Sequence, residues 1–244
     1  MYNFNSSYFR KAARMQLTGQ WGSAALVSFV LQVIYNAASG VSSVLAQIIA
    51  FVPAVVFALI LFNMGLHEDM VTLYVELFML PFFFVMALLS GFMLLPLLYS
   101  FAVIFLRNKR EGVSLDVSML FNGYREFKRV SGTLILMSIY TSLWSLLLYI
   151  PGIVKGISYS QTMFVLYDNP GLSYNKAIER SMAMMDGYKM KYFKLQLSFI
   201  GWWLLCMATC GIAVFWVMPY IYTANVHFYE FVKEEYEKKV LAAA

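Results

Sequence analysis

Polar residues that could do chemistry in this apolar chain gather in two short stretches. The first, PGIVKGISYSQ at 151–161, contains Lys155, Tyr159 and Gln161. The second, PYIYTANVHFYEF at 219–231, contains five more: Tyr220, Thr223, Asn225, His227 and Glu230. Lysine can bind an anion, hydroxyl and amide groups can hydrogen-bond a polar ligand, and a His with a Glu can bind a cation or relay a proton. These eight residues are therefore the candidate ligand-binding residues.

Lys155 raises the first question, because a charge at the centre of a bilayer costs about 2.5 to 3.5 kcal/mol on insertion scales. It lies four residues after Pro151, which we place in a Pro-Gly turn at the outer surface. Four residues of helix are about 6 Å, a distance that a lysine side chain covers. Two interpretations remain open: the amine reaches water, or it binds an anionic headgroup or substrate.

The second stretch places its polar residues on one face of a helix. Tyr220, Thr223 and His227 share that face, and Glu230 continues it one turn further. Such a stripe forms interhelical hydrogen bonds, or it shuttles a proton or binds a cation. Facing the polar residues at 159–162, it would line a small cavity between repeats, where transporters built from repeats place their sites.

The composition indicates a polytopic membrane protein with an all-α fold. Charged residues are 13% of the chain and hydrophobic residues 61%, with a mean hydropathy of +0.68. Apolar runs at 21–35, 77–106 and 195–218 approach or exceed the roughly 20 residues that a helix needs to cross a bilayer. None alternates apolar and polar residues as the strands of a barrel do.

An internal repeat organises the chain as a single membrane domain, 1–244. Short amphipathic segments at 5–18, 114–122 and 173–186 each run into a glycine and an aromatic residue, as in LTGQW, FNGYREF and MDGYKMKYF. The pseudo-repeats are 5–110, 114–168 and 173–238. Each is predicted to be a membrane hairpin preceded by an amphipathic surface helix, which gives about six transmembrane helices.

The first repeat is longer than the others, with an insertion at roughly 41–90. Its 21–62 stretch exceeds one span, and Pro53 and the 38–40 Ala-Ser-Gly step offer places to break it. We predict six spans with 41–62 as a non-crossing element, and eight spans as the alternative.

Charge placement predicts the topology. Seventeen of the 18 basic residues fall before, between or after the three hairpins, and Lys155 is the exception. The loop at 63–76 carries three acidic residues and no Lys or Arg. The positive-inside rule therefore places both termini in the cytoplasm.

Motifs of catalysis and metal binding are missing from the sequence. It has no Gly-rich phosphate loop, no zinc-binding helix motif and no nucleophile elbow, and its two histidines are too few for a His-rich metal site. Cys206 and Cys210 lie four apart in an apolar run, where we expect them to share a helix face and to pack. We predict no enzyme, no catalytic residue, no cofactor and no metal. Nucleic acid is excluded as a partner, because topology and anionic lipid account for the basic clusters.

A family resemblance rests on two stretches. AIERSMAMMDGYKMKYFKLQLSFIGWWLL with TCGIAVFWVMPYIYTANVHFYEF, within 177–231, resembles the bacterial integral-membrane family called domain of unknown function 975. LLYIPGIVKGISYSQTMFVLYDNP, 147–170, matches its pattern of a Pro-Gly turn, a Tyr-Ser pair and a closing Asp-Asn-Pro. The family is distantly similar to the membrane region beside glycerophosphodiester phosphodiesterase domains. The resemblance implies a bacterial inner (plasma) membrane location and brings no activity with it.

Three hypotheses for function follow. The leading one is a non-enzymatic protein that binds or moves a lipid or small solute in a cavity between hairpins. The alternative is a scaffold or assembly factor that docks a protein partner through its cytoplasmic amphipathic helices. The least favoured is an intramembrane enzyme that uses His227 and Glu230.

Overall fold

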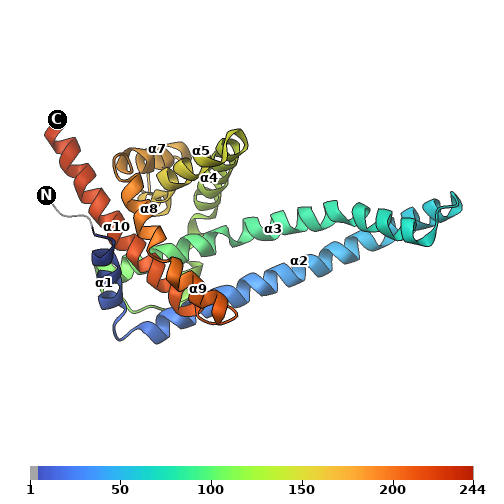
Figure 1. Ribbon diagram of the computed structural model, residues 1–244, viewed down its shortest axis with the longest axis horizontal. Helices are drawn as coiled ribbons and strands as arrows, with labels where there is room; N and C mark the ends of the chain where they lie inside the picture. Colours follow the sequence, from blue (N-terminus) through green and yellow to red (C-terminus); the bar gives the residue numbers. More distant parts are fainter. Residues whose placement is uncertain (1–4, 244) are drawn as a thin grey trace. The chain divides into compact units, whose positions relative to one another are not determined.

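Helices make up the architecture of the computed structural model, which describes residues 5–243 and has no β-strand in that range (Figure 1). The predicted all-α class is confirmed. The elements are α1 (Ser6–Leu17), α2 (Trp21–Asn63), α3 (Glu68–Glu111), the 3-10 helix η1 (Val117–Glu126), α4 (Phe127–Leu147), α5 (Tyr149–Tyr159), α6 (Thr162–Asp168), α7 (Tyr174–Met184), α8 (Lys189–Leu197), α9 (Ile200–Ala208) and α10 (Val214–Ala243).

Three helical segments are long and apolar enough to cross a membrane: Trp21–Asn63, Glu68–Glu111 and Val117–Leu147. The predicted arrangement of six spans in three hairpins remains a prediction. The chain divides into two compact units, one formed by Met1–Leu31 with Pro96–Ala244 and the other by Gln32–Leu95.

The unit at Gln32–Leu95 is a hairpin of the distal parts of α2 and α3. Gly65 in the connecting turn has φ +77°, a conformation that favours glycine. Phe57 of α2 stacks on Phe78 of α3 with ring centroids 4.7 Å apart. Buried small residues lie at intervals of four along one face of α2: Ser42, Ala46, Ala50 and Ala54. Small residues on a shared face are typical of helix pairs in membranes.

The predicted break within 21–62 is wrong, because α2 runs for 43 residues with Pro53 inside it. At the Ala-Ser-Gly step, the Ser42 hydroxyl donates to Ser39 O at 2.9 Å and the Ser43 hydroxyl to Gly40 O at 2.8 Å. These polar groups are thus satisfied inside the helix. In an apolar medium, freed backbone groups cost several kcal/mol each, so continuing through one proline is favoured over breaking there.

Amphipathic helices of the larger unit bury their apolar faces against the chain itself. The amphipathic segment predicted at 5–18 forms α1, which buries Phe9, Ala13 and Leu17. The Phe9 ring meets Phe228 and Phe231 of α10 edge-on, at centroid distances of 5.7 and 5.8 Å. The 173–186 segment forms α7, which packs on α4 and α6. The 114–122 segment lies at the start of η1, a 3-10 helix.

The second hairpin is formed by α4 and α5. Its turn lies at Leu148, which is extended at φ −158° and ψ 135°, not at the predicted Pro-Gly pair. Pro151 lies in the first turn of α5, where its missing N–H leaves no helical hydrogen bond unmade. Gly152 packs so closely on α4 that a Cβ there would overlap the Ser145 hydroxyl.

The third hairpin contains more helix breaks than the continuous apolar run 195–218 predicts. Its first arm consists of α8 and α9, and a turn after Ala208 leads into α10. Cys210 lies in that turn at φ +49°, next to Gly211 at φ +89°, whose N–H donates to Cys206 O at 2.8 Å. The expectation that the two cysteines share a helix face is therefore wrong. Cys206 is buried and Cys210 is exposed.

Gly123 of η1 makes the close contact that sets this helix against α3. Its N–H donates to the Ser100 hydroxyl at 2.7 Å. A Cβ at Gly123 would overlap Pro96 O and lie 2.6 Å from the Ser100 oxygen. We predict that Gly123→Ala destabilises the protein by about 1 to 3 kcal/mol, because the added methyl group forces η1 from α3.

Thermal unfolding of the purified protein in detergent measures this loss. Gly171→Ala is the matched control, since a Cβ at Gly171 meets no atom within 4 Å. Its melting temperature should equal that of the wild type. Equal melting temperatures for Gly123→Ala and Gly171→Ala would show that the contact with α3 is not tight.

Candidate ligand-binding site

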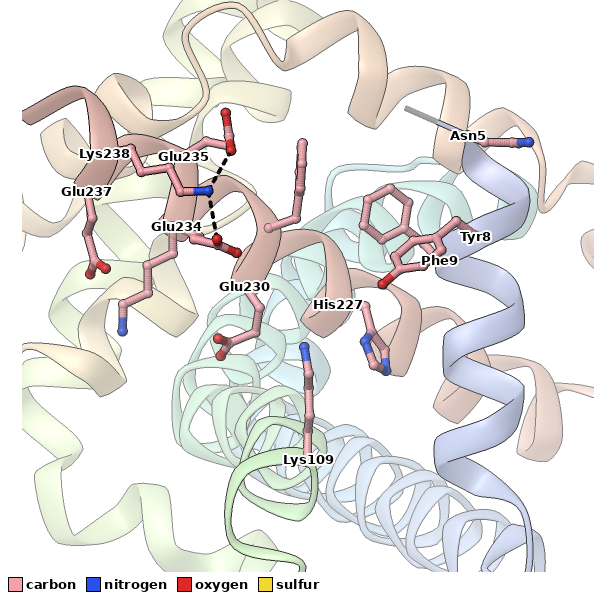
Figure 2. Close-up of a pocket in the computed structure, with 12 residues that line it drawn as sticks. Asn5, Tyr8, Phe9, Lys109, His227, Glu230, Glu234, Glu235, Glu237 and Lys238 are labelled. Atoms are coloured by element: carbon pink, nitrogen blue, oxygen red, sulfur yellow. Dashed lines mark hydrogen bonds and ion pairs between the residues drawn. The ribbon is translucent and has the colours of Figure 1, made fainter. Parts of the chain in front are cut away.

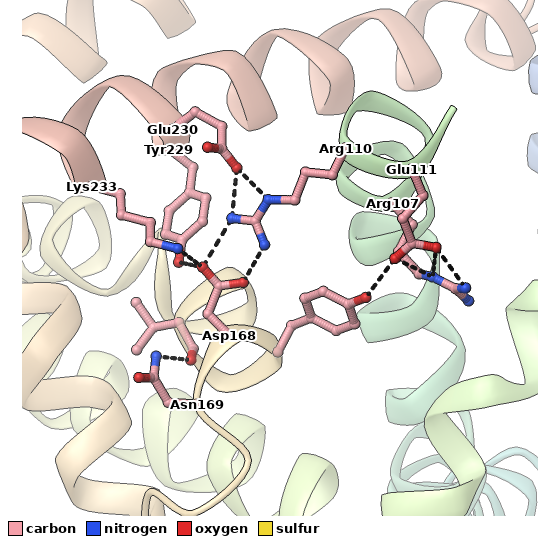
Figure 3. A network of polar contacts seen from close by, with 10 residues as sticks. Arg107, Arg110, Glu111, Asp168, Asn169, Tyr229, Glu230 and Lys233 are labelled. Atoms are coloured by element: carbon pink, nitrogen blue, oxygen red, sulfur yellow. Dashed lines mark hydrogen bonds and ion pairs between the residues drawn. The ribbon is translucent and has the colours of Figure 1, made fainter. Parts of the chain in front are cut away.

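A buried carboxylate, Asp168 at the end of α6, joins three helices (Figure 3). Only 6% of its side chain is exposed. Arg110 of α3 donates to both carboxylate oxygens, at 2.5 and 2.9 Å. From α10, the Tyr229 hydroxyl donates at 2.7 Å and the Lys233 amine at 2.6 Å. We call these four residues the Asp168 network.

Burial and hydrogen bonding act in opposite directions on the pKa of Asp168. Burial is the largest single influence and raises the pKa, because it disfavours the charged form. The hydrogen bonds from Arg110, Lys233 and Tyr229 together outweigh burial and lower the pKa from 3.8 to about 2. The carboxylate is therefore charged at neutral pH, with every donor supplied by the protein.

The residues next to Asp168 are held by further arginines. Arg129 of α4 donates to Leu166 O at 3.1 Å and to Asn169 O at 3.3 Å. Arg180 of α7 donates to the Asn169 side-chain oxygen at 3.1 Å. The Asp-Asn-Pro segment that contributed to the family resemblance is thus an anchoring point for several helices.

Glu230, a predicted ligand-binding residue, is paired with Arg110. The guanidinium Nε and a terminal nitrogen of Arg110 lie 2.7 and 2.6 Å from one Glu230 oxygen (Figure 3). Arg110 therefore bridges Glu230 and Asp168. The network thus engages Glu230, which also lines a cavity beside α10.

A cavity of about 520 Å³ lies among α3, α4, α5, α6, α8 and α10. We call it the hydroxyl cavity, because its polar lining is dominated by hydroxyl groups. Two predicted residues, Tyr159 of α5 and Asn225 of α10, line it together. The other lining residues are Ala102, Met137, Ser138, Thr141, Ser142, Gly156, Ser160, Met163, Phe164, Tyr192 and Tyr222.

The chemistry of the hydroxyl cavity is polar and uncharged. Its lining, all of it in the described part of the chain, includes no Asp, Glu, His, Lys, Arg or Cys. The hydroxyls of Ser138 and Thr141 donate to carbonyls of their own helix at 2.9 and 2.8 Å, so their lone pairs can accept from a ligand. The Asn225 oxygen accepts from Gln196 at 2.8 Å. Such a lining can hydrogen-bond a neutral polar group.

Three predicted residues are buried in helix packing and line no described cavity: Gln161, Thr223 and Tyr220. The Gln161 amide donates to the Ser160 hydroxyl at 2.8 Å, while its oxygen is buried without a partner among the described residues. Thr223 donates to Pro219 O at 2.7 Å. The ring of Tyr220 meets aromatic side chains on α2, on α9 and at Phe199.

Lys155 and His227 lie away from the hydroxyl cavity. The Lys155 amine sits over the Trp144 ring, 4.9 Å from its centroid, in a cation–π contact between α5 and α4. His227 lies beside Lys109 in a different cavity, and its Nε2 atom is buried without a hydrogen-bond partner in the described chain. His227 and Glu230, the last two residues of the predicted stripe on α10, line that cavity together, whereas Tyr220 and Thr223 do not line it.

Helices of this apolarity and length are compatible with a membrane protein. The chain belongs to the family described as Protein of unknown function (DUF975), which matches residues 1–236. The match thus also covers residues 1–146, which precede the stretches that carry the sequence resemblance. Comparisons with curated proteins and with solved structures found no match.

We predict that Asp168→Asn lowers the free energy of unfolding by about 3 kcal/mol, because it removes the counter-charge of Lys233 and leaves Arg110 with Glu230 alone. Glu234→Gln is the control. Glu234 pairs with Lys238 on the surface, where its side chain is 67% exposed, and such pairs contribute about 1 kcal/mol or less. Denaturation in detergent compares the two variants. A loss no greater for Asp168→Asn than for Glu234→Gln would contradict a stabilising network.

Proposed function

We propose that this protein binds, and in doing so helps to move, a neutral polar lipid or small solute in the hydroxyl cavity. The observation that supports the proposal is a cavity lined by hydroxyls and an amide, set among apolar helices. Polar groups inside a membrane domain are costly, so a cluster that faces an open cavity favours a binding role. Binding without catalysis is part of the proposal, because the cavity offers no carboxylate, imidazole or thiol.

The way into the hydroxyl cavity supports a ligand that arrives from the bilayer. Ser138 and Ser142 are exposed on α4, whereas Tyr159 and Phe164 are buried. α4 belongs to the candidate span Val117–Leu147. The opening therefore lies partway along a segment that can cross the membrane, where lipid is the neighbour.

The membrane arrangement that we propose has six crossings: α2, α3, α4, α5 with the start of α6, α8 with α9, and α10. Both termini then lie in the cytoplasm, and we propose a bacterial plasma membrane as the location. The distribution of the basic residues supports this orientation, since all but Lys155 fall at one set of helix ends.

Cysteine labelling tests this topology. We predict that His67→Cys, in the turn between α2 and α3, reacts with an impermeant maleimide in right-side-out membrane vesicles. Ser114→Cys, in the loop before η1, should react only after lysis. Both variants carry Cys210→Ser, because Cys210 is exposed. Labelling of Ser114→Cys in sealed vesicles would contradict the orientation.

We predict that Ser142→Phe lowers bound ligand at least about tenfold, equivalent to 1.4 kcal/mol, because a phenyl ring obstructs the cavity mouth. Native mass spectrometry of protein extracted from membranes measures the retained lipid or solute by its mass. Leu143→Phe is the control, because Leu143 is 54% exposed, adjacent on α4 and outside the cavity lining. The proposal would be refuted if the wild type retained no ligand. It would also be refuted if Ser142→Phe retained as much ligand as Leu143→Phe.

A scaffold role through the amphipathic helices has less support. The apolar faces of α1 and α7 are buried against α10, α4 and α6, so they are not free to dock a partner. A partner would have to use polar surface or the aromatic side chains that η1 leaves exposed, Phe121 and Tyr124.

A further inference from the structure

We propose a second binding site, for a phosphate group, formed by Lys11 of α1, Lys109 of α3 and His227 of α10. The three side chains line one depression of about 610 Å³. Polar residues of α1, of the turn between α1 and α2, and of α3 complete it, namely Gln16, Gln20 and Asn108. All of these residues belong to the larger compact unit.

The charge of this depression is positive and unpaired. Its lining includes two lysines and no Asp or Glu. Neither Lys11 nor Lys109 forms an ion pair with any residue that the structure describes. An anion would provide the counter-charge that both ammonium groups lack.

A neighbouring cavity shares Lys109 and His227 but is a poor place for an anion. Figure 2 shows Lys109 and His227 close together there, with Tyr8 of α1 nearby and four carboxylates along α10: Glu230, Glu234, Glu235 and Glu237. Glu230 forms its ion pair with Arg110 at 2.6 Å and acts on Lys109 at longer range, on the side of this cavity. An anion therefore approaches the lysine from the side of Lys11.

The base of the site is built by an amide network between α1 and α3. Gln16 donates to the Asn108 side-chain oxygen at 2.8 Å. Asn108 is 7% exposed and donates to the Gln20 oxygen at 2.9 Å and to Val113 O at 2.8 Å. These bonds fix α1 against α3, so Lys11 and Lys109 are held on one depression before any ligand binds.

Two buried polar atoms at the site have no partner among the described residues, and together they indicate the ligand chemistry. They are His227 Nε2 and the Gln16 side-chain oxygen. Buried polar groups usually have partners, so each is a place for a ligand atom. The imidazole N–H can donate to an anionic oxygen, whereas the amide oxygen needs a donor. A phosphate that carries an O–H group, or that has a hydroxyl beside it, meets both needs.

Such a phosphate can come from a lipid headgroup or from a free phosphate compound. Exposed apolar side chains flank the depression, with Tyr8 65% and Met15 67% exposed. The site also lies where the apolar α3 ends in a basic turn at Lys109 and Arg110. Apolar surface beside cations is typical of the interface where anionic headgroups lie.

The phosphate site does not depend on the proposed function. His227 and Asn225 are two residues apart on α10, so their side chains diverge by about 200°. The phosphate site and the hydroxyl cavity thus lie on different faces of this helix. Failure of either proposal leaves the other in place.

The test titrates full-length protein in detergent with phosphatidylglycerol, an anionic lipid with headgroup hydroxyls, and follows binding by native mass spectrometry. The site variant is Lys11→Gln with Lys109→Gln. The matched control is Lys128→Gln with Lys176→Gln, which removes the same charge from exposed positions elsewhere. We expect the Kd to rise about tenfold for the site variant and to stay within about twofold for the control.

The outcomes separate a built site from general attraction. Equal weakening in the site variant and the control, or no weakening in either, would overturn the proposal. So would equally tight binding of phosphatidylcholine, which carries no net charge and no hydroxyl. Lys11→Gln alone, at an exposed position, guards against misfolding and should raise the Kd several-fold.

Competition with inorganic phosphate identifies the source of the ligand. Displacement of phosphatidylglycerol from the wild type, with weaker displacement from the site variant, shows that the phosphate group alone is recognised. Charge-dependent lipid binding that inorganic phosphate does not displace shows that the lipid tails or the headgroup hydroxyls are also needed. Both results support the site.

Discussion

The buried carboxylate of Asp168 is the interaction on which the arrangement of the larger unit depends. An ionised carboxylate with 6% of its side chain exposed is stable only if charged donors surround it, and these come from α3 and α10. The end of α6 is therefore fixed to both helices. Phe164, one turn before Asp168, lines the hydroxyl cavity, and its ring lies 5.1 Å from that of Tyr229. The cavity and the ionic network thus share their supporting residues.

α10 presents a different chemistry on each of its faces. Asn225 faces the hydroxyl cavity, Tyr229 reaches the carboxylate of Asp168, and His227 lies with Lys109 and Lys11. Residues three and four apart can share a helix face, which led to the prediction of a single polar stripe. Because α10 packs against α1, α7 and α9 around its circumference, polar residues on its different faces have different neighbours.

Local patterns in the sequence were sufficient to predict the elements, whereas the pairing of distant residues was not. The apolar spacing of Phe9, Ala13 and Leu17 predicts α1 and its buried face, since that information lies within one helix. The insertion expected at roughly 41–90 falls within the separate unit Gln32–Leu95. The role of Asp168 could not be predicted, because its partners Arg110 and Lys233 are 58 and 65 residues away in the chain. The only local sign of this role in the sequence is that an acidic residue ends an apolar stretch.

The position of the turn between α4 and α5 also depends on a contact between helices that local sequence patterns do not predict. A Pro-Gly pair indicates a turn, yet the chain turns at Leu148, three residues earlier, because Gly152 is needed where α5 contacts Ser145 of α4.

Of the predicted ligand-binding residues, Tyr159 and Asn225 do line one cavity although they lie far apart in the sequence. Gln161 and Thr223 are of the same polar types but point into the protein. Residue type alone does not distinguish a lining side chain from a packed one.

The length of α2 has a consequence for the bilayer around it. Within the hairpin unit, residues 32–63 form continuous helix of about 48 Å, against a hydrocarbon core of about 30 Å. A helix of that length fits inside the core only if it tilts by about 50° from the bilayer normal. Membrane helices tilt by about 0–40°. Hydrophobic mismatch of this size requires local thickening of the bilayer or projection of the hairpin tip beyond it. The acidic pair Glu68 and Asp69, at the start of α3, lies at the end that would project.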